Sequence, residues 1–263
     1  MSRPDVAVIG GSGFYEFLTD PEFVEVSTPY GEPSALISVG SLGKRGVAFL
    51  PRHGRHHEFP PHRVNYRANL WALRSVGVRR VLAPCAVGSL QRQLGPGALV
   101  VPDQLVDRTA GRVQTYMDTG AAHVGFADPY CPSLRRALIN GDPSVVDGGT
   151  MVVIEGPRFS TRAESQWYAG QGWALVNMTG HPEAVLSREL AMCYSPIALV
   201  TDRDAGIYST ESVSQAAVFA EFGRNVERLR ELIADVIGSL PTGDPDCKCG
   251  RALDGMQLPF EPP

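Results

Sequence analysis

The chain has 263 residues, of which 43% are hydrophobic and 20% charged, and its net charge is −4. This composition argues against a disordered chain, and the acidic balance argues against a general nucleic-acid binder. No run of about 18 apolar residues is present, which excludes a membrane-spanning helix, and the N-terminus lacks the apolar segment of a signal peptide. We therefore expect a cytoplasmic protein without membrane or nucleic-acid partners, whose five scattered cysteines are reduced thiols.

Short apolar runs rich in Val and Ile alternate with helical patterns along the chain. The runs predict strands, and apolar residues at helical spacing predict helices between them. In chain order we expect strands over 6–9, 35–39 and 46–50, a helix over 64–76, strands over 80–83, 98–101 and 150–154, a helix over 161–169, a strand over 173–176, a helix over 182–192 and a strand over 197–201.

The longest helix has the clearest pattern. Its apolar residues recur every three or four positions from Phe222 to Leu240, which predicts one stripe that packs on the sheet. Ser212 and Ser214 are both good N-cap types for its start. Strands that alternate with helices predict an α/β fold, with a mainly parallel sheet in one layered domain over residues 1–240. Residues 241–263 are rich in Pro and Gly and form a tail or a packed extension.

A glycine-rich turn follows the first predicted strand. Residues 10–13 read Gly-Gly-Ser-Gly, and such a turn lets backbone N–H groups and the Ser12 hydroxyl approach an anion. The dinucleotide-binding fingerprint would need a further glycine where Glu16 stands. The alternative to an anion site is a plain tight turn.

Arginine and histidine crowd the segment after the strand over 46–50. Residues 52–63 hold three arginines and four of the six histidines. A guanidinium fork matches phosphate oxygens, and an imidazole can add a donor. A zinc site is the competing interpretation, but the segment offers no cysteine and no well-spaced acidic ligand. A solvated basic loop is the other alternative to a small-anion site.

Three more motifs follow later strands, where ligands sit in open α/β sheets. Phe159 lies between Gly-Pro and Ser-Thr. Its ring could be a platform on which a ligand stacks, or a loop side chain that packs on the domain. Thr179 could bind an anion at a helix start and Met178 could cover a sugar, or the segment is only a capping turn. Asp202 and Asp204 could recognise N–H groups or supply a proton if buried, or lie in an exposed turn.

In order and together, these motifs closely resemble the trimeric purine nucleoside phosphorylase family. The resemblance covers about residues 5–240 and rests on residues 10–13, 51–55, 65–73, 88–90, 155–160, 177–179 and 201–204. It implies a nucleoside-phosphorylase-like fold with a mixed central sheet flanked by helices. It also implies a homotrimer and a pentosyltransferase activity, the phosphate-dependent cleavage of 5′-methylthioadenosine to adenine and 5-methylthioribose 1-phosphate. Orthophosphate is then a co-substrate, and no cofactor or metal is expected.

The resemblance also implies roles for individual residues. Phosphate binding falls to Ser12, Arg52, His53, Cys85, Ala86 and Thr179. Nucleoside binding falls to Phe159, Ser160, Asn177, Met178, Asp202, Asp204, Gln215, Val218 and, from a neighbouring subunit, His123. Asp202 and Asp204 face purine N7 and the 6-amino group as the catalytic pair. A buried carboxylic acid can protonate the leaving purine, and phosphate can stabilise the cationic sugar.

Two residues depart from the family pattern. Cys85 stands where relatives usually carry Thr, and a thiol is a weaker donor to phosphate. Gln215 stands where methylthio-specific relatives carry a small apolar residue, and its amide can bond a 5′-hydroxyl. The second departure leaves open a broader purine nucleoside phosphorylase that also accepts adenosine.

Other functions are less consistent with the residues. A nucleosidase that uses water would give the Arg-His segment no purpose. An adenosine-binding module without activity would need Phe159 but neither the acids nor the phosphate residues. A dehydrogenase conflicts with Glu16. In the tail, a disulfide between Cys247 and Cys249 would be strained across one residue, so these are expected to be free thiols.

Overall fold

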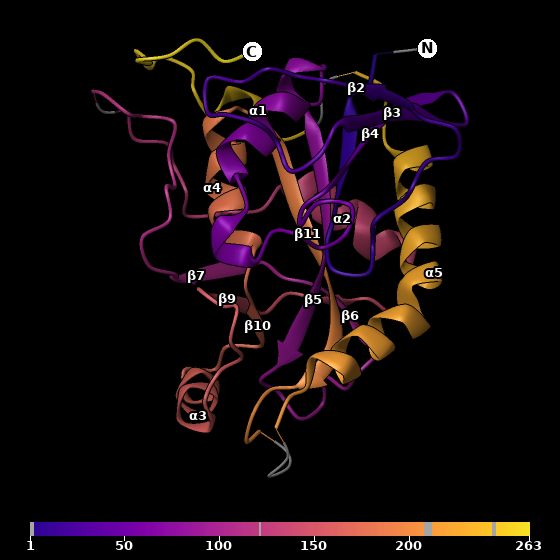
Figure 1. The fold of residues 1–263 in the computed structure, drawn as a ribbon, viewed down its shortest axis with the longest axis vertical. Helices are drawn as coiled ribbons and strands as arrows, with labels where there is room; N and C mark the ends of the chain where they lie inside the picture. The colour runs from indigo at the N-terminus through magenta and orange to yellow at the C-terminus, as the bar shows by residue number, and fades with distance from the viewer. Residues whose placement is uncertain (1–2, 121, 208–211, 244–245) are drawn as a thin grey trace.

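A computed structural model describes residues 3–120, 122–207, 212–243 and 246–263, which form an α/β fold around one mixed sheet (Figure 1). The eleven strands of the described residues are β1 (Val6–Gly10), β2 (Glu22–Val24), β3 (Ile37–Leu42), β4 (Arg45–Pro51), β5 (Arg80–Ser89), β6 (Leu99–Val101), β7 (Gln104–Arg108), β8 (Val146–Asp147), β9 (Thr150–Ile154), β10 (Leu175–Asn177) and β11 (Cys193–Arg203). The α-helices are α1 (Tyr66–Ser75), α2 (Pro132–Gly141), α3 (Arg162–Gly170), α4 (Gly180–Glu189) and α5 (Gln215–Ser239).

The sheet is organised around β5. The order β2-β3-β4-β1-β5-β10-β9-β7 forms the main path, and β11 pairs with β5 along nearly its whole length. β1, β4, β5 and β11 run parallel to one another. β10 and β9 are parallel to each other, but β10 is antiparallel to β5. The sheet is therefore mixed, and it contains two groups of strands that run in opposite directions.

Alternating residues of the strands supply two cores, one on each face of the sheet. In β11, Tyr194, Ala198 and Val200 join the core that includes α1 and α4. Ile197 and Leu199 join the core that includes α2 and α5. Successive side chains of a strand point to opposite faces, so β11 is buried on both sides and the run over residues 197–200 is apolar without alternation.

The long helix α5 follows the sequence prediction closely. Ser214 is its N-cap, and the Ser214 hydroxyl accepts a hydrogen bond from the N–H of Ala217 at 3.2 Å. Phe222, Leu229 and Ile233 of its stripe are buried. Figure 1 shows the helix lying along one side of the sheet, with α1 and α4 on the other side. None of the described helices combines the length and hydropathy that a membrane crossing needs.

Several boundaries differ from the sequence prediction. Predicted strands 80–83 and 197–201 extend to Arg80–Ser89 and Cys193–Arg203, each running through a proline that the sequence-based boundary excluded. The helix predicted over 182–192 ends at Glu189, because Ala191 adopts a left-handed φ of 52°. Strands β2, β7 and β8 and helix α2 were not predicted, since the strands are short and largely unburied and α2 buries only Leu134 and Leu138.

The two strand directions determine where the site forms. The parallel group ends its strands at Gly10, Pro51 and Arg203, and the β9–β10 pair runs the opposite way and ends at Ile154 and Asn177. Val176 of β10 lies opposite Gly88 of β5, so the end of β10 points back toward the middle of β5. The carboxyl ends of both groups therefore meet over β5, where the motifs of the sequence gather.

Candidate active site

A pocket of about 350 Å³ opens where these strand ends meet. That volume is in the range of small-molecule sites. It brings together the glycine turn, part of the Arg-His segment, the middle of β5, the segment around Phe159, the end of β10, the end of β11 and the start of α5. Of the site residues named from the sequence, all but one line this pocket: Ser12, Arg52, His53, Cys85, Ala86, Phe159, Ser160, Asn177, Met178, Thr179, Asp202, Asp204, Gln215 and Val218.

His123 is the residue that the single chain does not bring to the pocket. It is exposed, in the stretch between β7 and α2 that forms neither helix nor strand among its described residues. Figure 1 shows this stretch along the edge of the molecule, and two of its residues, Arg112 and Tyr116, pack against the body. The prediction placed His123 in the pocket of a neighbouring subunit, and that stays a prediction.

The glycine turn lies against a buried arginine. A Cβ on Gly11 would come within 2.9 Å of both Nη1 of Arg52 and the carbonyl oxygen of Pro84. The absence of a side chain at Gly11 therefore lets the turn, with Ser12, pack directly on the guanidinium. Gly13 has a φ of 82°, a conformation that favours glycine.

Arg52 is buried and paired with Glu183 of α4. Its Nε and Nη2 donate to the two carboxylate oxygens of Glu183, the second at 2.9 Å, and Nη1 donates to the carbonyl oxygen of Pro84 at 3.3 Å. The Tyr194 hydroxyl donates to the same carboxylate at 2.9 Å. Burial opposes the charged form of Arg52, but the Glu183 carboxylate more than offsets this and raises its pKa. The guanidinium thus stays positive and fixed in the pocket wall.

His53 is neutral, and its tautomer follows from its partner. Its Nδ1 lies 2.7 Å from the carbonyl oxygen of Phe59, which can only accept, so Nδ1 carries the proton and Nε2 is an acceptor. Burial, together with the charge of Arg52, lowers the pKa of His53 to about 3. The sequence prediction treated an imidazole in this segment as a donor, whereas this geometry makes Nε2 of His53 an acceptor.

The remainder of the Arg-His segment separates from the site. Of its arginines and histidines, only Arg52, His53 and His57 line the pocket, where Pro60 and Pro61 join them. Arg55, for example, is exposed and lies over the ring of Phe23 at 4.4 Å. The crowding of basic residues in the sequence therefore includes both pocket residues and a solvated surface.

Thr179 and Asn177 occupy the turn before α4. Asn177 accepts hydrogen bonds from the backbone N–H groups of Thr179 and Gly180, at 2.8 and 2.6 Å, and its amide donates to the carbonyl oxygen of Ala86 at 3.3 Å. Asn177 thus shapes the turn, while the Thr179 side chain makes no capping bond to α4. Opposite this turn, burial raises the pKa of the Cys85 thiol to about 12, so it stays protonated.

A β-bulge positions Asp202. The pairing of β11 with β5 skips one residue of β11 between Val200 and Asp202. Thr201 is therefore the extra residue, and Asp202 lies opposite Gly88. The Thr201 hydroxyl donates to Oδ1 of Asp202 at 2.8 Å. Burial, reinforced by the nearby Asp204, raises the pKa of Asp202 to about 6 despite this hydrogen bond. An acid with such a pKa is poised to give up a proton near neutral pH.

Asp204 is the second buried acid of the pocket. Ser165 of α3 donates to its Oδ2 at 2.7 Å. Burial raises the pKa of Asp204, and this hydrogen bond works in the opposite direction. A Cβ on Gly88 would lie 3.1 Å from Oδ2 of Asp202 and 3.3 Å from Oδ1 of Asp204. The glycine therefore leaves room for both carboxyl groups beside β5.

The other walls of the pocket are apolar. Phe159 and Met178 lie with Val87, Ile154 and Val176, which gives the pocket a surface for a flat aromatic ring. At another part of the lining, the start of α5 contributes Gln215, Val218 and Phe219. The ring of Phe219 meets the ring of His57 edge-on, with centroids 5.6 Å apart. Gln215 is the exposed, polar member of this wall.

Several residues that support the site were missed in the sequence. Glu183, Ser165 and Thr201 orient Arg52, Asp204 and Asp202 respectively. Each of these three supporting residues lies between one and 131 positions from the site residue that it orients. Ser165 and Thr201 carry no sequence signal, and Glu183 has only its place in the first turn of a predicted helix.

Arg112 is a further residue without a motif. Its guanidinium donates to the carbonyl oxygens of Met178, His181 and Glu155, at 2.9, 2.7 and 2.6 Å. It thereby connects the turn before α4 with the segment after β9. These are the two backbone segments that carry Met178 and Phe159 into the pocket.

Comparisons with known proteins agree with this geometry. The model of the family described as Phosphorylase superfamily matches residues 5–239. A Mycolicibacterium smegmatis protein named S-methyl-5′-thioadenosine phosphorylase is 62% identical over 98% of this chain and 99% of its own length. A Streptomyces coelicolor protein named purine nucleoside phosphorylase is 55% identical over 97% of this chain and 96% of its own. The crystal structure of a methylthioadenosine phosphorylase from an antarctic soil metagenomic library has a TM-score of 0.88 and 41% identity, over 97% of this chain and 92% of that one.

Proposed function

Because this chain belongs to the phosphorylase superfamily, we propose that its pocket cleaves 5′-methylthioadenosine with orthophosphate. The products are adenine and 5-methylthioribose 1-phosphate, which makes the protein a pentosyltransferase. The observation that carries this proposal is the composition of the pocket: two buried acids, one with a pKa of about 6, share it with a fixed guanidinium and a glycine turn. The relatives named as methylthioadenosine phosphorylases support the choice of substrate.

Phosphate binds between the glycine turn and the turn before α4. Arg52 supplies the positive charge, and Ser12, Thr179 and backbone N–H groups supply donors. Nε2 of the neutral His53 accepts a hydrogen bond from the protonated oxygen of hydrogen phosphate. Cys85 and Ala86 close this wall, and Cys85 contributes a weak donor.

The purine lies on Phe159, with Asn177 and Met178 against the ribose and base. Ser165 holds Oδ2 of Asp204, and Oδ1, which lies beside Gly88, accepts from the 6-amino group. Asp202 donates its proton to purine N7 as the glycosidic bond breaks, so the electron pair of that bond leaves with adenine. The sugar becomes oxocarbenium-like, and the phosphate on its other face stabilises this charge and then attacks C1′. Orthophosphate is a co-substrate in this scheme, in which no metal or cofactor takes part.

The 5′ end of the nucleoside faces the start of α5. Val218 and Phe219 suit a methylthio group, while Gln215 can bond a hydroxyl. This polar side chain favours a second candidate, a broader purine nucleoside phosphorylase that also uses adenosine. The Streptomyces coelicolor relative carries such a name.

The assembly is a homotrimer in which His123 of a neighbouring subunit completes the 5′ wall. The exposed position of His123, in the stretch between β7 and α2, supports this. The cytoplasm is the expected compartment, since none of the five cysteines, all within the described residues, is paired in a disulfide, and reducing compartments keep cysteines unpaired.

One experiment separates these functions. Release of adenine or hypoxanthine from methylthioadenosine, adenosine and inosine is followed with and without phosphate, and the sugar phosphate is identified by phosphorus NMR. We expect phosphate-dependent cleavage with the highest kcat/KM for methylthioadenosine. Adenine release without phosphate would instead identify a nucleosidase. Tight nucleoside binding with no turnover would identify a binding module.

A further inference from the structure

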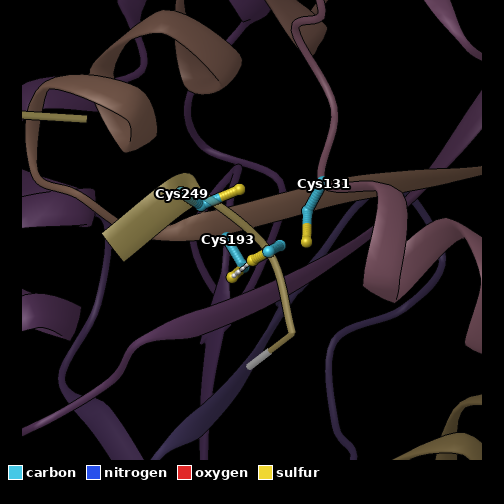
Figure 2. Close-up of side chains that lie close together, drawn as sticks. Cys131, Cys193 and Cys249 are labelled. Atoms are coloured by element: carbon cyan, nitrogen blue, oxygen red, sulfur yellow. Dashed lines mark hydrogen bonds between the residues drawn. The ribbon is translucent and has the colours of Figure 1, made fainter. Parts of the chain in front are cut away.

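Four of the five cysteines gather at one place outside the pocket. The sulfur atoms of Cys131, Cys193, Cys247 and Cys249 all lie within 4.8 Å of one another. Figure 2 shows the side chains of Cys131, Cys193 and Cys249 close together. Three of the four are buried and Cys247 is half-buried. Cys85, the fifth cysteine, lies apart from this group, in the phosphate wall.

The four cysteines come from three separate parts of the chain. Cys131 is the N-cap residue of α2, and Cys193 is the first residue of β11. Cys247 and Cys249 belong to the tail and are separated by one residue, Lys248. The backbone N–H of Cys131 donates to the carbonyl oxygen of Tyr194 at 2.8 Å, which connects the two body segments. The Ser133 hydroxyl donates to the carbonyl oxygen of Asp246 at 2.6 Å, which brings the tail to the same place.

The spacing of the sulfurs fits a metal better than a disulfide. Tetrahedral zinc with Zn–S bonds of about 2.3 Å separates its four sulfurs by about 3.8 Å. The sulfurs of Cys193 and Cys247 are 3.4 Å apart, and the remaining pairs lie within 4.8 Å. A disulfide needs about 2.05 Å between its sulfurs and joins only two of them. Shifts of about 1 Å or less would therefore place all four at zinc-ligand spacing.

The position of the Cys131 sulfur, at the N-terminus of α2, also suits a negative charge. Cys131 is the N-cap residue of α2, and its sulfur makes no capping bond to the helix. Backbone N–H groups and the helix dipole there favour an anionic ligand such as a thiolate.

We propose that Cys131, Cys193, Cys247 and Cys249 bind one zinc ion as a closed tetrathiolate site. On binding, the four thiols lose four protons, and the four thiolates fill the coordination sphere of the ion. No position is left for water or substrate, so the ion is structural. The site is also far from the chemistry, because Cys193 and Asp202 lie toward opposite ends of β11, about 30 Å apart at the usual rise of a strand.

The ion fastens the tail to the body of the protein. The tail runs from the core beneath α2 and α5, which includes Cys249, to the opposite face, where Phe260 packs against Trp71 and Tyr116. In the described part of the tail, two hydrogen bonds from the body add to this packing: Arg80 donates to the carbonyl oxygen of Gly243, and Ser133 donates to that of Asp246. A metal ion bound by two cysteines of the body and two of the tail would hold the tail in place. Such an ion replaces the apolar core that a segment this short cannot form by itself.

The first test uses the unmodified protein, purified without chelator after growth with added zinc. Elemental analysis should give one zinc per chain. Denaturation with a chelator and no reductant should then expose all five cysteines as thiols. Replacement by Co²⁺ should give the intense visible bands and thiolate charge-transfer bands of a tetrahedral tetrathiolate. Five thiols without bound metal would overturn the proposal in favour of a simple thiol cluster, and one or three thiols would overturn it in favour of disulfides.

The second test compares two serine variants. Cys249→Ser should lower zinc affinity by more than about 100-fold, because loss of an outer-shell partner alone costs about 10- to 100-fold. Its Tm should fall by about 5 °C or more, and chelator should no longer change the Tm. Cys85→Ser is the matched control and should retain one zinc per chain. Full zinc content in Cys249→Ser, or loss of zinc in the control, would refute the site. If Cys249→Ser does not fold, the metal and thiol counts of the unmodified protein still decide.

The kinetic outcome separates this site from the proposed active site. Folded Cys249→Ser protein should retain kcat and KM for the nucleoside at temperatures well below its Tm. Zinc loss accompanied by loss of kcat at such temperatures would contradict a purely structural ion. The metal count itself does not depend on whether the proposed phosphorolysis is correct.

Discussion

Asp202→Asn tests the proposed acid through two independent properties. The amide has nearly the shape of the carboxyl group, and its oxygen can still accept the hydrogen bond from Thr201 that measures 2.8 Å. It cannot deliver a proton to the purine. A general acid contributes about 10²- to 10⁴-fold, so kcat should fall by that factor while KM changes little.

The same substitution should stabilise the protein at neutral and alkaline pH. Burial raises the pKa of Asp202 from 3.8 to about 6, so between these pH values the folded state binds more protons than the unfolded state. The protonated Asp202 therefore makes its full favourable contribution to the free energy of unfolding below pH 3.8. That contribution is lost as the pH rises through 6. The ionised carboxylate then costs about 3 kcal/mol at pH 8 and about half of that at pH 5. An uncharged amide does not have this cost.

The measurements are kcat/KM against pH and the free energy of unfolding by urea at pH 5 and pH 8. Wild-type kcat/KM should decline above an apparent pKa near 6, and this limb should be absent from the variant. Asp202→Asn should gain more stability at pH 8 than at pH 5. Asp235→Asn, an exposed position on α5, is the control and should change neither property. If kcat of Asp202→Asn stays within tenfold of wild type and its stability does not rise at pH 8, Asp202 is not the acid.

Three substitutions and one mass measurement address the remaining assignments. Arg52→Lys retains a positive charge but loses the two-point pairing with Glu183 that fixes the charge in the pocket wall. The phosphate KM should therefore rise at least about tenfold, for about 1.5–3 kcal/mol, with little change in the nucleoside KM. An unchanged phosphate KM would remove Arg52 from the phosphate site. Asp204→Asn should raise the kcat/KM of inosine relative to methylthioadenosine, because an amide can donate to a 6-oxo group; an unaltered ratio would separate Asp204 from the base. Gln215→Val should raise the preference for methylthioadenosine over adenosine about tenfold, for about 1.4 kcal/mol, and a ratio that does not move would place Gln215 outside the 5′ wall. Light scattering should give the mass of a trimer, and a fully active monomer would contradict the role of His123.

Local pattern was sufficient for most of the fold. The stripe of α5 and the apolar runs of β1, β4 and β9 are visible in the sequence because burial against one face or two imposes a period on the side chains. The placement of motifs after strands also indicated a pocket at strand ends. The sequence did not show that β9 and β10 run opposite to the parallel group and that their ends turn back toward the middle of β5. Short strands such as β8, with two exposed residues, leave no such pattern.

The sequence by itself determined which residue types the site contains, and the family resemblance assigned roles to them. Their states were decided by the tertiary structure, because a pKa depends on burial and on neighbours that can be distant in the chain. Glu183 fixes Arg52 across 131 positions, and the carbonyl of Phe59 fixes the tautomer of His53. The bulge at Thr201 sets the direction of Asp202. The four clustered cysteines are the extreme case: scattered over 131–249 they predicted only free thiols, and the packing of α2, β11 and the tail brings their sulfurs to one point.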